Sequence, residues 1–467
     1  MADYDAVIIG TGQAGPALAR RLVAAGWKVA IIERKFFGGT CINTGCTPTK
    51  TLIASGYAAH LTRRAAEFGV TLSGTPSVDM KAVKARKDAV TMASRAAVER
   101  SLKGLQGCTV YEAHATFIGP KQIKVADEVL RADKIFINVG GRAVIPSIPG
   151  LDKVPYLTNS SMMNVDFLPA HLIVLGGSYV GLEFAQLYRR FGSDVTVIEP
   201  APRLVSREDE DVSRAIADIL EAEDIDIRVN SKAVGVKKQG TGIAVTIETA
   251  GTRSQVDGSH LLLAVGRRPN TDDLGLEHAG VVTDARGYIE VDDQLRTSVP
   301  GIWALGDCNG RGAFTHTSYN DFEIVAANLL DNDQRRVTDR ITAYALYIDP
   351  PLGRAGMTEA EVRKSGRPAL IATMAMENVS RAYEKSETKG FMKILVDRET
   401  KEILGASLLG LSGDEVIHCI LDTMYAKAPS TVLQRAMHIH PTVSELIPTM
   451  LGELQPLSGT ADAKTAH

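Results

Sequence analysis

The sequence predicts an α/β protein with two copies of one strand–turn–helix–strand module and a C-terminal α+β domain. Its 467 residues correspond to about three domains, at ~100–200 residues per domain. A short apolar strand followed by a glycine-rich turn occurs near the N-terminus and again near residue 172. After residue 340 the pattern changes to alternating strands. These observations together define the fold class.

The first module lies at the N-terminus. Residues 5–9 are expected to form a strand, residues 10–15 a turn, residues 16–25 a helix and residues 28–32 a second strand. This order is that of a βαβ unit.

The turn of this module has the spacing of a phosphate-binding loop. Gly10, Gly12 and Gly15 form a G-x-G-x-x-G pattern between strand and helix, and Glu33 ends the next strand. Such a loop brings backbone N–H groups and the positive end of a helix to a pyrophosphate, while the acid binds the adenosine ribose. We therefore expect the first module to bind a dinucleotide.

The second module repeats this pattern. It has a strand at 172–175, a loop that keeps Gly176 and Gly181 but has Ser178 in place of the middle glycine, and a second strand at 194–198. Serine is small enough for the loop still to approach a phosphate.

The acid after this module indicates which nucleotide it binds. Glu199 ends the second strand, where a carboxylate accepts the 2′-hydroxyl of NAD and repels the 2′-phosphate of NADP. Arg203 is near enough in sequence to offset part of that repulsion. The pattern therefore favours NADH over NADPH.

The rest of the chain divides into three stretches. Residues 51–105 are expected to form two helices separated by a polar stretch at 69–78. Beyond residue 340, strands such as 391–396 alternate with turns, and helices follow Gly413. The tail from Pro456 is expected to be loop-like and disordered.

Composition excludes several classes of protein. Charged residues make up 23% and the net charge is −3, so neither nucleic acid nor an anionic membrane is an expected partner. No signal peptide is evident, and no apolar stretch reaches the ~18–20 residues of a membrane helix, so a cytoplasmic location is expected.

The cysteines are few, and only Cys41 and Cys46 are close together. The four residues between them include Asn43 and Gly45, and this spacing allows the two sulfurs to meet. A metal site is not expected, because no second Cys/His pair has zinc-ligand spacing. A redox-active pair beside the first dinucleotide module is the favoured interpretation.

The segment 38–50, Gly-Gly-Thr-Cys-Ile-Asn-Thr-Gly-Cys-Thr-Pro-Thr-Lys, resembles the active-site signature of the family that contains dihydrolipoamide dehydrogenase, glutathione reductase and mercuric reductase. Residues 301–307 resemble the second flavin segment of that family, and residues 264–267 resemble the strand that closes its FAD domain. The matches extend from residue 5 to about residue 448.

The resemblance implies two Rossmann-like dinucleotide-binding domains, for FAD and NAD, and a C-terminal α+β dimerisation domain. The implied boundaries are 1–145 with 267–338 for FAD, 146–266 for NAD(P), and 339–467 for dimerisation. The residues implied for FAD are Gly10, Gly12, Gly15, Glu33, Thr40, Lys50, Ala115, Asp307 and Thr315. Those implied for NAD are Gly176, Gly181, Glu183, Glu199 and Gly266.

The resemblance also implies a path for electrons, from NADH to FAD, to the Cys41–Cys46 disulfide and to an external disulfide. Cys41 is then the thiol that meets the substrate, and Cys46 is the thiol that faces the flavin. Lys50 and Glu183 match an ion pair on the nicotinamide side of the flavin. Phe314, which follows the flavin aspartate, is expected either to line the flavin pocket with His316 or to pack.

Residues 438–445 resemble the C-terminal base motif of the family. By this match His440 is the acid/base and Glu445 orients it. In the family this motif reaches the cysteines of the other subunit, so a homodimer is expected and a monomer would be inactive.

The substrate is less specified. Mercuric reductases carry a C-terminal cysteine pair, and no cysteine follows residue 445, so a disulfide such as lipoamide is favoured. However, residues 312–321 depart from the lipoamide dehydrogenase pattern, and Thr47 and Thr49 are atypical. The alternative is a mercuric-reductase-like flavoprotein that reduces Hg(II), Cu(II) or a quinone. A third hypothesis is a subunit of a multienzyme complex, although no docking segment is recognisable.

Overall fold

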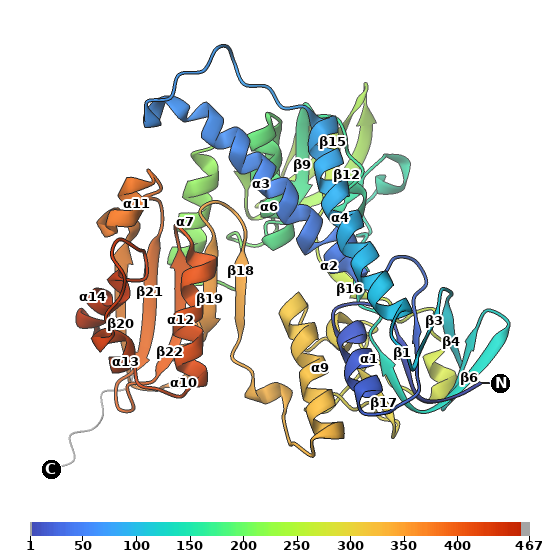
Figure 1. Cartoon of the computed structure of the whole chain (residues 1–467). Helices are drawn as coiled ribbons and strands as arrows, with labels where there is room; N and C mark the ends of the chain where they lie inside the picture. The colour runs from blue at the N-terminus through green and yellow to red at the C-terminus, as the bar shows by residue number, and fades with distance from the viewer. Residues whose placement is uncertain (1, 459–467) are drawn as a thin grey trace.

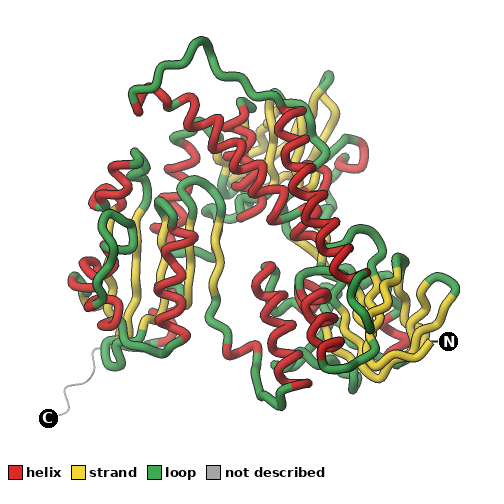
Figure 2. The backbone as a smooth tube through the Cα atoms, viewed as in Figure 1, coloured by secondary structure: helices red, strands yellow, loops and turns green. Residues whose placement is uncertain are grey.

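The computed structural model describes residues 2–458. Figure 2 shows that the strands gather in three separate groups with helices between them. No helix in this described part is both long and apolar enough to cross a membrane. The tail beyond residue 458, which we expected to be disordered, lies outside the described residues.

The first group is a seven-stranded sheet with the order β3-β2-β1-β6-β5-β4, in which β17 also pairs with β6. Its strands are β1 Ala2–Ile9, β2 Val29–Ile32, β3 Cys108–Tyr111, β4 Ala115–Gly119, β5 Gln122–Val125, β6 Glu128–Ile137 and β17 Ile302–Ala304. Strand β1 lies at the centre, and its second half, from Ala6 to Ile9, is buried and apolar on both faces. Val7 and Ile9 pack into one hydrophobic cluster, and Ala6 and Ile8 pack into another on the opposite face.

The second group is a five-stranded parallel sheet with the order β11-β10-β9-β15-β8. Its strands are β8 Leu157–Thr158, β9 His171–Leu175, β10 Asp194–Ile198, β11 Asp226–Arg228 and β15 His260–Leu263. Helix α6, Tyr179–Phe191, follows β9, and helix α7, Glu210–Glu221, precedes β11. A three-stranded antiparallel sheet of β12 Ser231–Gln239, β13 Gly242–Thr249 and β14 Thr252–Gly258 extends this group.

One expected strand is interrupted. Strand β15 ends at Leu263, and a new strand, β16 Arg267–Pro269, pairs with β7 Gly141–Ala143 in a separate two-stranded sheet. The expectation of a strand over 264–267 is therefore wrong for 264–266. The chain leaves one sheet for another there, and Gly266 has a φ of +125° that favours glycine.

The two helices expected over 51–105 are confirmed, as α3 Cys46–Arg63 and α4 Met80–Lys103. Helix α3 passes close to α6, and this contact between the helices connects the two modules (Figure 1). A Cβ at Gly56 of α3 would lie 2.8 Å from Leu187 Cδ1, so the absence of a side chain permits this approach. The N-terminus of α3, where Cys46 lies, is thereby fixed relative to both modules.

The third group is a six-stranded antiparallel sheet with the order β18-β19-β22-β21-β20-β23. Its strands are β18 Ala343–Leu346, β19 Leu352–Gly356, β20 Ala369–Ala375, β21 Phe391–Asp397, β22 Ile403–Leu409 and β23 Gln455–Pro456. Pro456, expected to begin a loop, therefore belongs to a two-residue strand. Helix α12, Gly413–Tyr425, packs on β19 and β22, while α13, Thr431–Arg435, and α14, Leu446–Gly452, lie near β20 (Figure 1).

Candidate active site

Cys41 and Cys46 lie on two consecutive helices. Cys41 is in the short helix α2, Gly39–Thr44, and Cys46 is the first residue of α3. Gly45 separates them with φ −134° and ψ −121°, which breaks the helix and turns the chain between the two thiols. Both cysteines are free thiols in this structure.

Asn43 fixes α2 in place. Its side-chain amide donates hydrogen bonds to the backbone oxygens of Phe37 at 2.9 Å and Gly39 at 2.8 Å. Its oxygen accepts a bond of 2.7 Å from Arg95 Nε. Asn159 adds a bond of 2.9 Å to the backbone oxygen of Thr44. The loop that holds the two thiols is therefore anchored from several directions.

The pKa values of the two thiols are shifted in opposite directions. A hydrogen bond from Cys41 lowers the pKa of Cys46 to about 6; partial burial opposes this shift, and Thr315 and Lys50 support it. The Thr315 hydroxyl lies 3.2 Å from Cys46 Sγ. The pKa of Cys41 is strongly raised by the same hydrogen bond and by burial. In the dithiol form, Cys46 is therefore the thiolate.

Lys50, one turn along α3, forms an ion pair with Glu183 of α6. Lys50 Nζ lies 2.8 Å and 2.7 Å from the two carboxylate oxygens. Tyr347 joins this pair, because Lys50 Nζ lies 4.4 Å from its ring centroid and its backbone N–H donates to Glu183 at 3.1 Å. The ion pair therefore connects the cysteine helix to the second module.

The first glycine-rich loop fits a dinucleotide. Gly10 has a φ of +104°, and a Cβ at Gly15 would lie 2.3 Å from the Gly10 carbonyl oxygen, so glycine is required where helix α1, Ala14–Ala24, meets the loop. A Cβ at Gly12 would lie 3.0 Å from Asn138 Oδ1. Glu33 accepts hydrogen bonds from Thr11, at 3.1 Å from its backbone N–H and 2.6 Å from its hydroxyl.

The second loop has the same internal geometry. Gly176 has a φ of +110°, and a Cβ at Gly181 would lie 2.0 Å from the Gly176 carbonyl oxygen. Glu199 accepts bonds from the backbone N–H groups of Gly177 at 2.6 Å and Ala201 at 2.8 Å. The two modules therefore place equivalent carboxylates beside equivalent loops, and both fit the adenosine half of a dinucleotide.

The other residues expected at FAD lie around the first module. Burial raises the pKa of Asp307, and Arg267, 3.4 Å away, opposes that shift. Thr40 is in α2 beside Cys41, and Ala115 is buried on β4. The placements of Asp307, Thr40 and Ala115 fit FAD on the first module, and their individual roles stay predictions. Gly266, which is expected at NAD, lies in the turn between β15 of the second module and β16.

His440 and Glu445 form a close pair. His440 Nδ1 lies 2.9 Å and 3.1 Å from the two Glu445 oxygens, which leaves Nε2 available. The His440 side chain is 74% exposed, and its neighbours Met437 and Ile439 are 98% and 80% exposed. The segment lies between α13 and α14, on the side of the C-terminal sheet remote from α2 (Figure 1). This chain therefore does not bring His440 to its own cysteines.

Asn138 and Tyr347 were missed by the sequence reasoning. Asn138 follows β6, accepts a bond of 3.1 Å from the Gly15 backbone N–H and donates one of 2.9 Å to the Leu305 oxygen. A polar residue directly after a buried strand of the first module is a signal that would have found Asn138. No local pattern marks Tyr347, because its contact with Lys50 depends on chain folding over almost 300 positions.

The comparisons with known proteins agree with this geometry. Residues 4–321 match the family model described as pyridine nucleotide-disulphide oxidoreductase, and residues 342–451 match its dimerisation domain. The chain belongs to the pyridine nucleotide-disulphide oxidoreductases. Members of this family are FAD-dependent flavoproteins that use a pyridine nucleotide, so the expected fold class and cofactors are confirmed at that level. The dimerisation domain supports a homodimer.

Three curated members are similar over nearly their whole length. The probable pyridine nucleotide-disulfide oxidoreductase RclA of Escherichia coli is 37% identical over 453 residues, which cover 95% of this chain and 98% of that protein. A mercuric reductase of Streptomyces lividans is 34% identical and covers 95% and 94% of the two chains. A dihydrolipoyl dehydrogenase of Thermus scotoductus is 33% identical and covers 95% and 96%.

A solved structure of a family member is also similar. The Cu(II) complex of the HOCl-induced flavoprotein disulfide reductase RclA from Escherichia coli has a TM-score of 0.88 and 35% identity. It covers 97% of this chain and 99% of that one. The family is thus established, whereas the substrate of this member is not.

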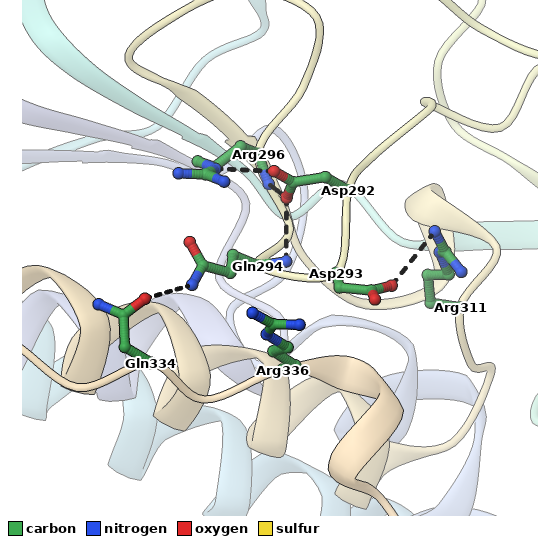
Figure 3. A pocket seen from close by; sticks show the side chains of 7 residues that line it. All are labelled: Asp292, Asp293, Gln294, Arg296, Arg311, Gln334 and Arg336. Carbon is green, nitrogen blue, oxygen red and sulfur yellow. Dashed lines mark hydrogen bonds and ion pairs between the residues drawn. The ribbon is translucent and has the colours of Figure 1, made fainter.

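A polar surface pocket of about 560 Å³ lies apart from these site residues. Figure 3 shows its lining, which is Asp292, Asp293, Gln294, Arg296, Arg311, Gln334 and Arg336. Arg296 bonds Asp292 at 2.7 Å, and Gln294 bonds Gln334 at 3.2 Å. None of the residues expected at the flavin, the nucleotide or the thiols lines this pocket.

Proposed function

We propose that this protein is an NADH-dependent flavoprotein that exchanges electrons between NADH and a small disulfide such as lipoamide. Cys41 is the thiol that meets the substrate, and His440 of the partner subunit is its acid/base. The observation that carries this proposal is the His440 side chain, which pairs with Glu445, is exposed next to apolar residues and lies remote from the cysteines of its own chain. A base in this position serves a thiol on another subunit.

FAD, when bound, passes an electron pair between the nicotinamide and the cysteine pair. The chain then performs thiol–disulfide exchange. His440 of the partner subunit takes the proton of the Cys41 thiol while the Cys41 sulfur attacks one sulfur of the external disulfide. His440 then returns this proton to the leaving thiolate. Cys46 thiolate then attacks Cys41, which closes the Cys41–Cys46 disulfide and releases the second thiol. Overall, one disulfide, one NADH and one proton become two thiols and NAD⁺.

NADH is the proposed nucleotide because Glu199 presents a carboxylate where the adenosine ribose is expected. Arg203, the residue that could offset this charge, instead donates to the backbone oxygens of Ser206 at 3.3 Å and Glu208 at 3.4 Å. Its charge is therefore used within its own loop, which strengthens the preference for NADH.

Reduction of Cu(II) is the second candidate, and the similarity to the Cu(II) complex of RclA favours it. Two Cu(II) ions would each take one electron from the dithiol. The Cys41–Cys46 disulfide would form from the Cys46 thiolate and the Cys41 thiol, and the single proton of Cys41 would leave. Thiolates bind copper well, but this route has no thiol leaving group that His440 must protonate.

The two candidates are separated by an anaerobic assay of NADH and NADPH oxidation with lipoamide, glutathione disulfide and Cu(II). The unaltered enzyme is compared with Cys46→Ser and His440→Gln. We expect NADH with lipoamide to give the fastest turnover, Cys46→Ser to abolish it, and His440→Gln to lower it by about 10²–10⁴-fold.

Turnover of Cu(II) but not of any disulfide, unaffected by His440→Gln, would overturn the lipoamide proposal in favour of the metal ion. Lipoamide turnover that persists in Cys46→Ser would exclude both candidates. In each case retention of bound FAD, measured by absorbance, verifies that the variant has folded.

A further inference from the structure

A row of buried side chains crosses the C-terminal sheet. In the strand register, Ser407 of β22 pairs with Arg354 of β19 on one side and with Lys393 of β21 on the other. The Arg354 and Lys393 side chains are each only 1% exposed. Buried cations are costly unless they are paired, so their partners define a contact of specific geometry.

Both cations have acidic partners in the second nucleotide module, and Lys393 also pairs with Glu359 of the C-terminal domain at 3.2 Å. Arg354 Nη1 lies 3.8 Å from Glu208 Oε2 and 3.6 Å from Asp209 Oδ2, and Lys393 Nζ lies 2.8 Å from Asp211 and 3.1 Å from Asp209. The three acids lie just before and within the first turn of α7, which runs beside the C-terminal sheet (Figure 1). The charge cluster therefore joins two parts of the fold.

Glu208 is the most buried of these acids, and it connects to aromatic residues. Its Oε1 accepts a hydrogen bond of 2.5 Å from the Tyr344 hydroxyl and one of 3.5 Å from the Tyr179 hydroxyl. Burial raises the pKa of Glu208, and Arg354 and Tyr344 oppose that shift. Loss of the Arg354 charge would therefore leave this carboxylate buried without a cation beside it.

The segment that carries Glu208 is bonded directly to the second glycine-rich loop. The Val205 backbone N–H donates to the Gly177 carbonyl oxygen at 2.8 Å. A Cβ at Gly177 would lie 2.6 Å from Leu204 Cδ2, so the segment and the loop are in tight contact. Glu208 is therefore only three residues along the chain from a direct hydrogen bond to the loop.

Tyr179 connects the same loop to the thiols. It is the first residue of α6. Its ring centroid lies 5.5 Å from the ring centroid of Tyr344 and 6.1 Å from that of Phe314. Phe314 directly precedes Thr315, whose hydroxyl contacts Cys46. Phe314 also stacks on His316 and Tyr344, so it belongs to an aromatic cluster between the loop and the redox site.

We propose that Arg354 is a positioning residue for pyridine-nucleotide binding. By pairing with Glu208 across the domain boundary, Arg354 fixes the hydrogen bonds of Tyr179 and the position of the loop from Gly176 to Gly181. This inference rests on the proposed assignment of the nucleotide to the second module. Arg354 acts through Glu208 and does not itself contact the nucleotide.

The test is Arg354→Met in the FAD-loaded enzyme, assayed with the better of NADH and NADPH for the unaltered enzyme. We expect KM for the nucleotide to rise about tenfold, a typical coupling between sites, while kcat at saturating nucleotide changes little. Calorimetric titration with the oxidised nucleotide should show the same loss of affinity without turnover. Arg354→Lys, which keeps the positive charge, should retain part of the nucleotide affinity that Arg354→Met loses.

Lys393→Met is the matched control, because Lys393 is equally buried in the same row but, within the described part of the chain, forms its ion pairs with Asp209, Asp211 and Glu359 and not with Glu208. It should lower thermal stability without raising KM. An equal rise in KM in Lys393→Met would overturn the proposal, because the effect would then be general loosening of the domain boundary.

Tyr344→Phe tests the same connection if Arg354→Met fails to fold, because it removes only the hydroxyl that donates to Glu208. A several-fold rise in KM supports the proposal. Unchanged nucleotide affinity in a folded Tyr344→Phe enzyme would overturn the proposal.

Failure of the proposed NADH preference would give a different result. The unaltered enzyme would then prefer NADPH to NADH, but its affinity for the preferred nucleotide would still depend on Arg354.

Discussion

Cys46 owes its acidity to a few neighbouring groups. The largest effect is the hydrogen bond from Cys41, followed on the stabilising side by the Thr315 hydroxyl and the charge of Lys50. The start of the 18-residue helix α3 adds a favourable dipole for a thiolate at this position. Because burial raises the pKa of Cys46, loss of the Cys41 hydrogen bond that lowers it should increase this pKa strongly.

This reasoning predicts different effects of two substitutions at Cys41. The pKa of Cys46 is lowered to about 6, so its thiolate predominates above that pH and is lost below it. Cys41→Ala removes the hydrogen-bond donor, so the pKa of Cys46 should rise. Cys41→Ser keeps a donor, so the pKa of Cys46 should rise less. Alkylation of Cys46 by iodoacetamide against pH, located by mass spectrometry, measures both.

An equal shift in the two Cys41 variants would show that the neighbouring hydrogen bond does not control Cys46. The other described cysteines provide an internal reference, because burial raises the pKa of Cys108, Cys308 and Cys419. Their alkylation should therefore begin only at higher pH.

At the scale of elements, the arrangement of the thiols depends on α2. Asn43 makes three side-chain hydrogen bonds, two that join this helix to Phe37 and Arg95 and one to Gly39 at its start, whereas Asn159 contributes one. Asn43→Ala leaves buried backbone oxygens without a donor, which should destabilise α2 by about 3 kcal/mol. Asn159→Ala, the control, should cost about 1 kcal/mol.

Hydrogen–deuterium exchange of the peptide that covers residues 39–45 is the appropriate measurement, because the opening is local. Exchange should accelerate much more in Asn43→Ala than in Asn159→Ala. Similar exchange in the two variants would show that α2 is held by packing rather than by the Asn43 amide.

Elements with a local signal could be predicted from the sequence. Both βαβ modules lie within a few residues of their expected positions, because an apolar strand, a glycine loop and a terminal acid follow one another in the chain. The interruption at Gly266 could not be predicted, since an apolar run does not show where a strand changes sheets. The same holds for the break at Gly45, which depends on backbone angles.

Side-chain contacts between distant segments had no local signal. Arg354 appears in the sequence as an ordinary residue after a pair of prolines, and its pairing with Glu208 depends on two domains meeting. The Lys50–Glu183 pair was found only through resemblance to a family, and Tyr347 beside it was missed. Local patterns therefore predict the modules, whereas long-range packing completes the site.

At the scale of the whole molecule, one chain keeps the cysteine pair and the proposed base, His440, far apart. Cys41 and Cys46 belong to α2 and the start of α3, whereas His440, next to the exposed Ile439, belongs to the segment between α13 and α14. Figure 1 shows α13 and α14 remote from α2. Exposed side chains such as Met437 and Ile439 are typical of a surface that another protein covers. The proposed function requires a two-fold dimer in which each His440 meets the cysteines of the partner subunit.

The separation of the cysteine pair from His440 predicts complementation between inactive subunits. Cys41→Ser and His440→Gln homodimers should each have almost no disulfide reductase activity. In a heterodimer of the two variants, one site has both defects and the other has an intact Cys41 with an intact His440 from the partner. Subunits that are mixed in equal amounts, dissociated and reassembled should recover about a quarter of the normal activity. Half of the dimers are then heterodimers, and one of the two active sites in each heterodimer is intact. If His440 served its own chain, every site in the mixture would lack one group and no activity would return.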